Sequence, residues 1–233
     1  MTLDGMKTLL KNQFKNKKVN LTRYADDWVI TAESREVAEQ VKSAIESFLA
    51  ERGLTLSEEK TKIVHIDEGF DFLSWNFRKY DGKLLIKPSK KAVATITRTM
   101  SDIIRRSKSA SQGVLIEKLN PVILGWSLYH RNAVSTKTFS RLDYIMWEML
   151  WHWAKRRHPD KGHQWTAHRY WHSIDNSNWV FKTFTSTLRR FSDTKTRRHT
   201  LVQLERNPFL DAEYFCQRDC NIITRQTTVY SFF

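Results

Sequence analysis

The sequence predicts an α+β fold, in which a few antiparallel strands with one packed helix are followed by an all-α bundle. Up to residue 86 the chain holds short β-rich runs separated by turn residues. After Pro88, apolar residues recur at helical spacing instead. With 233 residues, of which 40% are hydrophobic, the chain has enough apolar side chains for one good core or two modest ones.

The first predicted element is a β-hairpin that carries two neighbouring carboxylates. The stretch VNLTRYADDWVITA, residues 19–32, consists of two β-rich runs broken at Ala-Asp-Asp. Asp26 and Asp27 are therefore expected at the tip. Adjacent like charges repel, so such a pair indicates either a turn in open solvent or a site for a cation.

A helix and further strands are predicted between this hairpin and Pro88. Ser34 is a good N-cap, five apolar residues share the helical face after it, and Gly53 ends the element. Beyond it, TKIVHI at 61–66 and GKLLIKP at 82–88 flank FDFLSWNF and are predicted to be strands, with a tight turn at Asp81-Gly82. The apolar helix positions are Val37, Val41, Ala44, Ile45 and Phe48.

Three amphipathic helices are predicted after Ser89, and they are expected to form a small bundle. The second is expected to restart or bend at Asn120-Pro121, and the third to stop in KRRHPDKG. From about Gly162 the chain is rich in Trp, His and Arg with weak periodicity, so its fold stays open. The predicted domains are residues 1–86, 87–160 and 161–233. The apolar positions are Val93, Ile96, Met100, Ile103 and Ile104, then Leu115, Ile116, Leu119, Trp126 and Tyr129, then Phe139, Leu142, Ile145, Met146, Met149, Leu150 and Trp153.

The net charge of +14 is unevenly distributed along the chain. Residues 1–86 carry 14 basic and 14 acidic side chains, whereas residues 87–160 carry 14 basic and 5 acidic ones. This excess predicts a polyanionic partner, most simply nucleic acid; the alternative is a solvated lysine-rich surface. No run has the length of a membrane span and no secretory signal is seen. We therefore expect no membrane partner, and a cytoplasmic location or, in a eukaryote, an organellar matrix.

Five segments, in this order, resemble motifs of the reverse transcriptases encoded by group II introns. The first three look like the later motifs of the polymerase palm, and the last two look like the thumb, or maturase domain. A lone YADD arises easily by chance, whereas the ordered series is specific and covers roughly residues 2–175. The segments are RYADD (23–27), GLTLSEEKTKI (53–63), GFDFLSW (69–75), KLNPVILGWSLYHRN (118–132) and FSRLDYIMWEMLWHWAKRRHP (139–159).

The resemblance implies a partial polymerase palm followed by an all-α thumb, with a catalytic role for the hairpin carboxylates. Polymerases of this kind use two divalent ions, here Mg²⁺, and carboxylates are the ligands that this ion prefers. Asp26 is then the main catalytic metal ligand and Asp27 the supporting one. Family members commonly carry Gly in place of Ser74, so a positive φ would strain this turn. The implied primer- and substrate-binding residues are Tyr24, Lys60, Phe72, Leu73, Ser74 and Trp75.

In relatives the thumb binds the intron RNA and helps it to fold for splicing, and the basic excess lies in the corresponding part of this chain. Structured RNA is recognised mainly through shape and backbone, so basic side chains on the helices are the expected contacts. These are Lys90, Lys91, Arg98, Arg105, Arg106, Arg131, Lys155, Arg156 and Arg157. Aromatic candidates for stacking on unpaired bases, with core packing as the commoner alternative, are Tyr129, Trp151 and Trp165. Polar surface or RNA contacts, rather than metal ligation, are expected for His158, His163, His168 and His172, and structural roles for Cys216 and Cys220.

The sequence thus predicts a truncated group II intron reverse transcriptase/maturase that binds intron RNA, with a DNA primer or target as a further candidate partner. In relatives the fingers and early palm precede YADD and supply another essential Asp. No segment here resembles them, so little or no polymerase activity is expected from this chain alone. One alternative is half of a split reverse transcriptase that a second chain completes. Others are a nonenzymatic RNA-binding splicing factor and a relic without present function.

Overall fold

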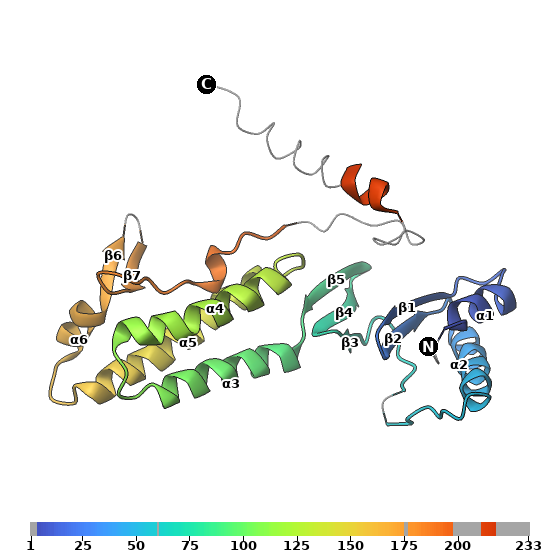
Figure 1. The fold of residues 1–233 in the computed structure, drawn as a ribbon, viewed down its shortest axis with the longest axis horizontal. Helices are drawn as coiled ribbons and strands as arrows, with labels where there is room; N and C mark the ends of the chain where they lie inside the picture. The colour runs from blue at the N-terminus through green and yellow to red at the C-terminus, as the bar shows by residue number, and fades with distance from the viewer. Residues whose placement is uncertain (1–3, 60, 175–176, 198–210, 218–233) are drawn as a thin grey trace, which may run out of the picture. The chain divides into compact units, whose positions relative to one another are not determined.

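The computed structural model describes residues 4–59, 61–174, 177–197 and 211–217, and it confirms the predicted α+β class (Figure 1). The described strands all pair antiparallel. The chain forms two compact units, 1–196 and 197–233, and residues 212–217 of the second are helical. The first unit has two separate hydrophobic clusters, one in an N-terminal module and one in a helical bundle.

The N-terminal module consists of two helices and a hairpin. Its elements are α1 (Met6–Gln13), β1 (Asn20–Tyr24), β2 (Asp27–Thr31) and α2 (Arg35–Ala50). The Ser34 hydroxyl accepts a hydrogen bond from the backbone N–H of Val37 at 3.3 Å, which confirms the predicted start of α2. Four of the five predicted apolar residues of α2 are buried and Ala44 is half-buried, packed with α1 and the apolar side chains of the hairpin.

A three-stranded sheet follows, in the order β3–β4–β5. Its strands are β3 (Phe70–Phe72), β4 (Trp75–Tyr80) and β5 (Lys83–Pro88). Two-residue turns at Leu73-Ser74 and at the predicted Asp81-Gly82 connect them, and all four turn residues have the positive φ of a type I′ turn. The strand predicted at 61–66 is wrong. Its β-branched residues favour a strand, but it forms no ladder with a described segment, and Ile63 and Val64 are exposed. Its one backbone bond to β4 runs from the Lys79 N–H to the Ile66 carbonyl at 3.0 Å.

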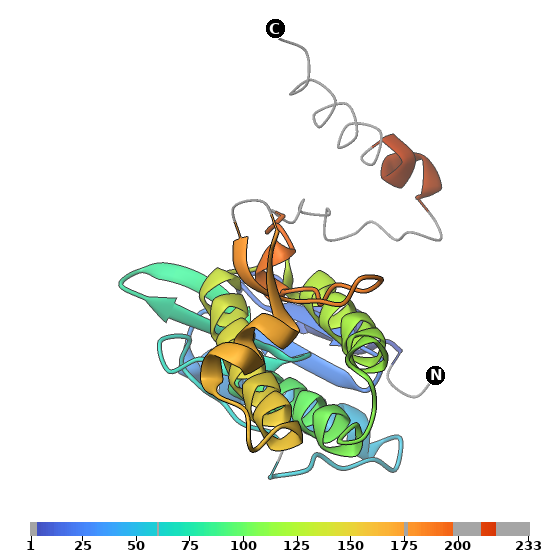
Figure 2. The ribbon, with the colours of Figure 1, turned by 90° about the vertical axis from the view of Figure 1, so that its left-hand side faces the viewer.

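Three helices form the predicted bundle, with α3 packed against both of the others (Figures 1 and 2). They are α3 (Lys90–Arg106), α4 (Gln112–His130) and α5 (Thr136–Arg157). Hydroxyls of Ser89 and Ser111 cap α3 and α4 by accepting backbone N–H bonds. Of the two predicted outcomes at Asn120-Pro121, a restart or a bend, the restart does not occur. Pro121 removes one backbone hydrogen bond, but Leu119 and Ile123 on either side are fully buried and their packing keeps the helix continuous.

Residues 163–194, whose fold the sequence left open, complete the bundle. Their elements are α6 (His163–Tyr170), β6 (Trp171–Ile174), β7 (Ser177–Phe181) and the 3₁₀ turn η1 (Phe191–Asp193). Tyr170 and Phe181 meet Trp153 of α5 edge-on, with ring centroids 5.5 and 6.1 Å apart. Phe191 is fully buried against Trp126. These elements are short and bury single aromatic rings. The sequence therefore shows no extended hydrophobic repeat from which they could be predicted.

Polar side chains of α4 hold the segment 182–194, here termed the strap. Gln112, Asn120 and Ser127 follow one another at intervals of eight and seven residues, which places them on one face of α4. The amides of Gln112 and Asn120 donate hydrogen bonds to the strap carbonyls of Lys182 and Thr187 at 3.1 and 3.0 Å. The Ser127 hydroxyl accepts one from the strap hydroxyl of Thr194 at 2.8 Å. The strap therefore follows this face of α4.

Candidate carboxylate hairpin and nucleic-acid interface

Asp26 and Asp27 lie at the tip of the β1–β2 hairpin. Tyr24 pairs with Asp27 at the end of the ladder, so Ala25 and Asp26 form the two-residue turn. Both carboxylates are exposed, and neither forms an ion pair with another described residue. The tight turn therefore holds two adjacent negative charges in solvent.

The backbone of this turn is strained at one residue. Ala25 has φ +52°, in the left-handed region where a Cβ atom costs about 1 kcal/mol. A positive φ at a central residue is common in two-residue hairpin turns, where Gly, Asn or Asp usually takes the position that Ala25 takes here. The Arg23 guanidinium, paired with Asp4 at 3.0 Å, helps to fix the end of β1. Tyr24 is 65% exposed beside the carboxylates and is free to contact a ligand bound there.

The donor set of the hairpin suits one hard cation. Mg²⁺ is usually held by one or two carboxylates together with water and phosphate oxygens. Asp26 and Asp27 supply two adjacent carboxylates with open space around them. Within the described part of the chain, no group of three or more His, Cys, Asp or Glu side chains is placed to hold a metal. The chemistry of these two carboxylates is compatible with a Mg²⁺ ion, although they alone do not fill its coordination sphere.

The second predicted site, the turn of FDFLSWNF, is strained at both central residues. The φ angle is +49° at Leu73 and +68° at Ser74. A residue with a Cβ atom in this left-handed backbone conformation costs about 1 kcal/mol of stability, whereas glycine adopts the conformation freely. The positive φ that favours glycine at position 74 is thus present, and Ser74 adopts it under strain.

This turn is attached to the helical bundle through its own carbonyl groups. The Tyr129 hydroxyl donates a hydrogen bond to the Leu73 carbonyl at 2.8 Å, and the Ser89 N–H donates to the Ser74 carbonyl at 2.9 Å. The ring of Trp75 stacks on Tyr129 with centroids 5.6 Å apart. Among the predicted primer contacts, Ser74 is exposed and the side chains that are half-buried are Phe72, Leu73 and Trp75. The predicted phosphate contact Lys60 lies outside the described residues.

His130, which no sequence pattern singles out, is buried where this sheet meets the bundle. Its ring centroid lies 4.3 Å from that of Trp75 and 4.1 Å from that of Trp126. Burial lowers the pKa of His130 to about 4, so the ring is neutral at physiological pH. Its Nδ1 atom is buried without a hydrogen-bond partner in the described part of the chain. His130 therefore serves the junction as a packed aromatic ring.

The basic side chains of α3 lie on the side opposite its buried face. Lys91, Arg98 and Arg105 recur every seven residues and are exposed, so they form one line along the helix. Asp102 lies beside this line and pairs with Arg105 at 2.7 Å, which offsets part of its charge. The buried residues of the other side are Ala92, Ile96, Met100 and Ile104. The flanking predicted contacts Lys90 and Arg106 are exposed as well.

The last turns of α3 and α5 lie together, which brings predicted RNA contacts from two helices to one end of the bundle. The Trp153 indole N–H donates to the Ser107 carbonyl at 2.9 Å. Arg157 donates to the carbonyls of Lys108 and Ala110 at 2.8 and 2.7 Å, so its guanidinium also has a structural role. We term this region the basic end; its cations are Arg105, Arg106, Lys108, Lys155, Arg156 and Arg157.

The remaining predicted contacts are partly engaged inside the fold. Arg131 is half-buried just after α4. Of the aromatic candidates, Tyr129 is held by the FDFLSWNF turn and Trp151 is half-buried against Trp147 with centroids 5.6 Å apart. Trp165 is exposed, 4.8 Å from the His158 ring. Trp165 and Tyr129 are both exposed, at 41% and 51%, so base stacking is open to these two more than to Trp151.

The four predicted polar histidines have separate surroundings. His158 Nε2 lies 2.8 Å from the Tyr170 hydroxyl, and the ring of His163 stacks on Trp151. His168 is bonded within its own helix, and His172 is exposed. Cys216 is exposed, and Cys220 lies outside the described residues.

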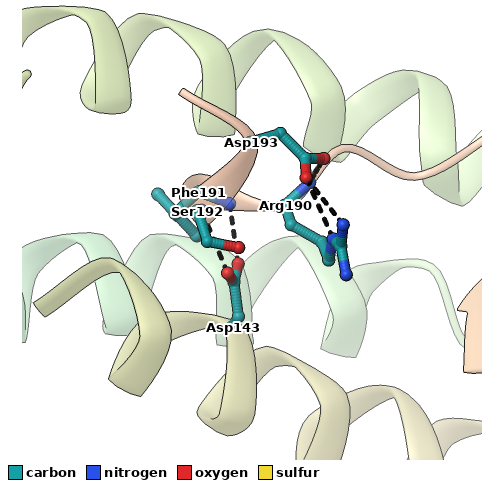
Figure 3. Close-up of polar contacts among 5 residues, drawn as sticks. All are labelled: Asp143, Arg190, Phe191, Ser192 and Asp193. Atoms are coloured by element: carbon teal, nitrogen blue, oxygen red, sulfur yellow. Dashed lines mark hydrogen bonds and ion pairs between the residues drawn. The ribbon is translucent and has the colours of Figure 1, made fainter. Parts of the chain in front are cut away.

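Asp143 of α5 has a structural role that was not predicted from the sequence, although the residue lies within the quoted segment 139–159 (Figure 3). Its carboxylate accepts hydrogen bonds from the backbone N–H groups of Phe191 and Ser192 at 2.7 and 3.0 Å. Burial raises the pKa of the Asp143 carboxyl, and these bonds offset part of that rise. Arg190 and Asp193 form an ion pair at 2.9 Å beside it. Asp143 thereby holds the strap turn, a role visible in sequence only as a single carboxylate among apolar helix positions.

Two family models match the chain. The model of the reverse transcriptase (RNA-dependent DNA polymerase) matches residues 1–77, and that of the group II intron maturase-specific domain matches residues 93–171. A comparison with curated proteins found no match. Among the described helices none is both long and apolar enough to cross a membrane. The first match contains the β1–β2 hairpin and the Leu73-Ser74 turn, and the second contains most of the bundle and of its basic residues.

Proposed function

The chain belongs to the group II intron reverse transcriptase/maturase proteins, and on that premise we propose that it binds structured intron RNA through the basic end of its bundle. The observation that supports this most strongly is the meeting of the α3 and α5 ends. There the side chains of Trp153 and Arg157 on α5 are hydrogen-bonded to the backbone just after α3, so cations far apart in the sequence come to one end of the bundle. A surface of this kind binds phosphates regardless of sequence.

The proposed architecture assigns a partial polymerase palm to residues 1–86 and a thumb to residues 87–160. The strained FDFLSWNF turn supports this assignment, because its carbonyls are bonded to α3 and α4. A primer end resting on that turn would be positioned by the bundle that holds the RNA. Both domain boundaries remain predictions.

A pair of charge reversals at the basic end tests the RNA assignment. Arg105→Glu with Arg106→Glu is expected to weaken binding of a structured RNA. Because two phosphate contacts are lost, the slope of log K against log salt is expected to become shallower by roughly 1.5 to 2. Binding is measured by fluorescence anisotropy at several salt concentrations.

The matched control is Lys118→Glu with Lys137→Glu, which makes the same change in net charge at exposed positions of α4 and α5 outside the basic end. It is expected to leave the slope nearly unchanged. Equal loss of binding in both double variants would show only a general charge effect and would exclude the basic end as the specific RNA contact.

A second candidate function is nucleotidyl transfer at the hairpin, favoured by two exposed carboxylates that form no ion pair with another described residue. We propose Asp26 and Asp27 as ligands of Mg²⁺, which when bound would activate a primer hydroxyl and stabilise the charge on a leaving pyrophosphate. The protein's own contribution is to hold both carboxylates in a fixed turn beside Tyr24. Enzymes of this family use a further Asp, so we propose that a further segment or a second chain completes the site.

Primer extension on an RNA template tests this second candidate. The chain alone is expected to extend no more primer than Asp26→Ala does. Mn²⁺ is expected to broaden the amide resonances of Tyr24 and Asp27 in the wild type and not in Asp26→Ala with Asp27→Ala. Extension by the chain alone that disappears in Asp26→Ala would contradict the proposed need for another ligand.

A further inference from the structure

An open hollow of about 520 Å³ lies next to the basic end, formed where the start of α4 meets α6, β6 and the strap. Its cationic or imidazole side chains are Arg157, Arg169, His172 and Lys182, and no carboxylate is among the described residues that line it. Its volume is that of a typical small-molecule site. Because charges of one sign line the hollow, an anionic group is attracted into it.

An aromatic ring stands on the rim of this hollow. Phe184 is 106% exposed, so it has no packing role in the described part of the chain. It lies in the tight turn Thr183–Ser186. In that turn the Thr183 N–H donates to the Ser186 carbonyl at 2.8 Å, and the Ser186 N–H donates to the Thr183 hydroxyl at 2.9 Å. These bonds fix the turn backbone, and the turn presents an apolar ring to solvent beside a group of cations.

The backbone around the hollow is fixed by hydrogen bonds from Gln112 and Arg157, most of them half-buried. Gln112 donates to the carbonyls of Tyr170 and Lys182 at 2.9 and 3.1 Å, which joins α4 to both sides of the hollow. Arg157 is tied to the loop before α4. The two lining cations whose side chains have no bond to another described residue are Arg169 and Lys182. Their backbone is therefore preorganised while their charges stay available.

We infer that this hollow binds one unpaired nucleotide of an RNA, with its phosphate near Arg169 and Lys182 and its base stacked on Phe184. Proteins bind single-stranded nucleic acid through this combination of cations and exposed aromatic rings. The inference rests on the proposed RNA-binding function and narrows it to a single-stranded site. An acidic peptide could pair with the cations, but it would not account for the exposed ring of Phe184 on the rim.

Anisotropy with the full chain tests the inference, with a labelled oligouridylate and a labelled RNA duplex of the same length as probes. Phe184→Ala is expected to weaken oligouridylate binding about tenfold, as loss of one base stack does, and to leave duplex binding unchanged. Phe184→Tyr keeps the ring and is expected to bind as the wild type. Tyr144→Ala removes an accessible ring on α5 outside the hollow and is expected to change neither affinity.

The cations are tested by their salt dependence. Arg169→Gln with Lys182→Gln is expected to reduce the salt slope for oligouridylate by about 1.4, or about 0.7 for each lost phosphate contact. Lys118→Gln with Lys137→Gln, outside the hollow, is expected to leave it unchanged.

The outcomes separate this inference from the proposed function. If the chain binds RNA and Phe184→Ala changes nothing, or weakens duplex and oligouridylate equally, the single-stranded site is wrong while RNA binding stands. If polyglutamate competes for the hollow with the same dependence on Phe184, the site is a peptide site. If the wild-type chain binds neither probe, the proposed function fails and this inference with it.

Discussion

At the scale of single residues, positive φ at described non-glycine positions occurs in two turns within the reverse transcriptase match and, outside that match, at Asp81 and Trp179. Ala25, Leu73 and Ser74 all have positive φ without being glycine. Such conformations persist where the surrounding structure enforces them, and they are found more often at functional sites. The sequence suggested strain at Ser74 through the glycine of its relatives, whereas nothing in the sequence marked Ala25.

Replacing Ser74 by glycine tests the strain directly. Ser74→Gly removes the Cβ penalty of about 1 to 2 kcal/mol, while the greater freedom of glycine in the unfolded chain returns part of it. We expect a net gain in the free energy of unfolding of about 0.5 to 1 kcal/mol, measured by urea titration. Ser43→Gly, on the exposed side of α2, is expected to lower stability by about 0.5 kcal/mol. A loss at both positions would show that Ser74 is unstrained.

At the scale of elements, the sequence predicted the helices in which the hydrophobic repeat extends over many residues. The bundle helices were found because each repeats an apolar position over four or more turns. The strand at 61–66 failed because a strand needs a partner as well as propensity. The strap was missed because its attachments are single polar side chains of α4 and α5, which a hydrophobic pattern does not show.

The strap is expected to depend on Asp143. Asp143→Ala leaves the N–H groups of Phe191 and Ser192 without their acceptor beside a fully buried ring, and is expected to lower the free energy of unfolding by about 1 to 3 kcal/mol. Asp143→Asn retains one acceptor oxygen and is expected to lose less. Amide exchange at Phe191 reports the same difference locally. Wild-type stability and exchange in Asp143→Ala would mean that Leu188 and Phe191 hold the strap by burial alone.

At the scale of the whole molecule, the uneven distribution of charge along the chain was enough to predict a polyanionic partner. The meeting of the α3 and α5 ends could not be predicted from the sequence, because it depends on tertiary contacts such as the hydrogen bond from Arg157 to the Lys108 carbonyl. The carboxylate pair was predictable from the YADD motif at residues 24–27 and from the motifs that follow it. The hollow beside Phe184 was not, since its lining comes from four separate stretches of chain.

The central claim is that the chain binds RNA through phosphate contacts. The most direct measurement is the affinity of the unaltered chain for a structured group II intron RNA between about 50 and 200 mM salt, where several phosphate contacts change affinity by orders of magnitude. We predict tight binding at low salt and a steep linear fall of log K with log salt. No detectable binding at low salt, or an affinity that does not depend on salt, would contradict the account.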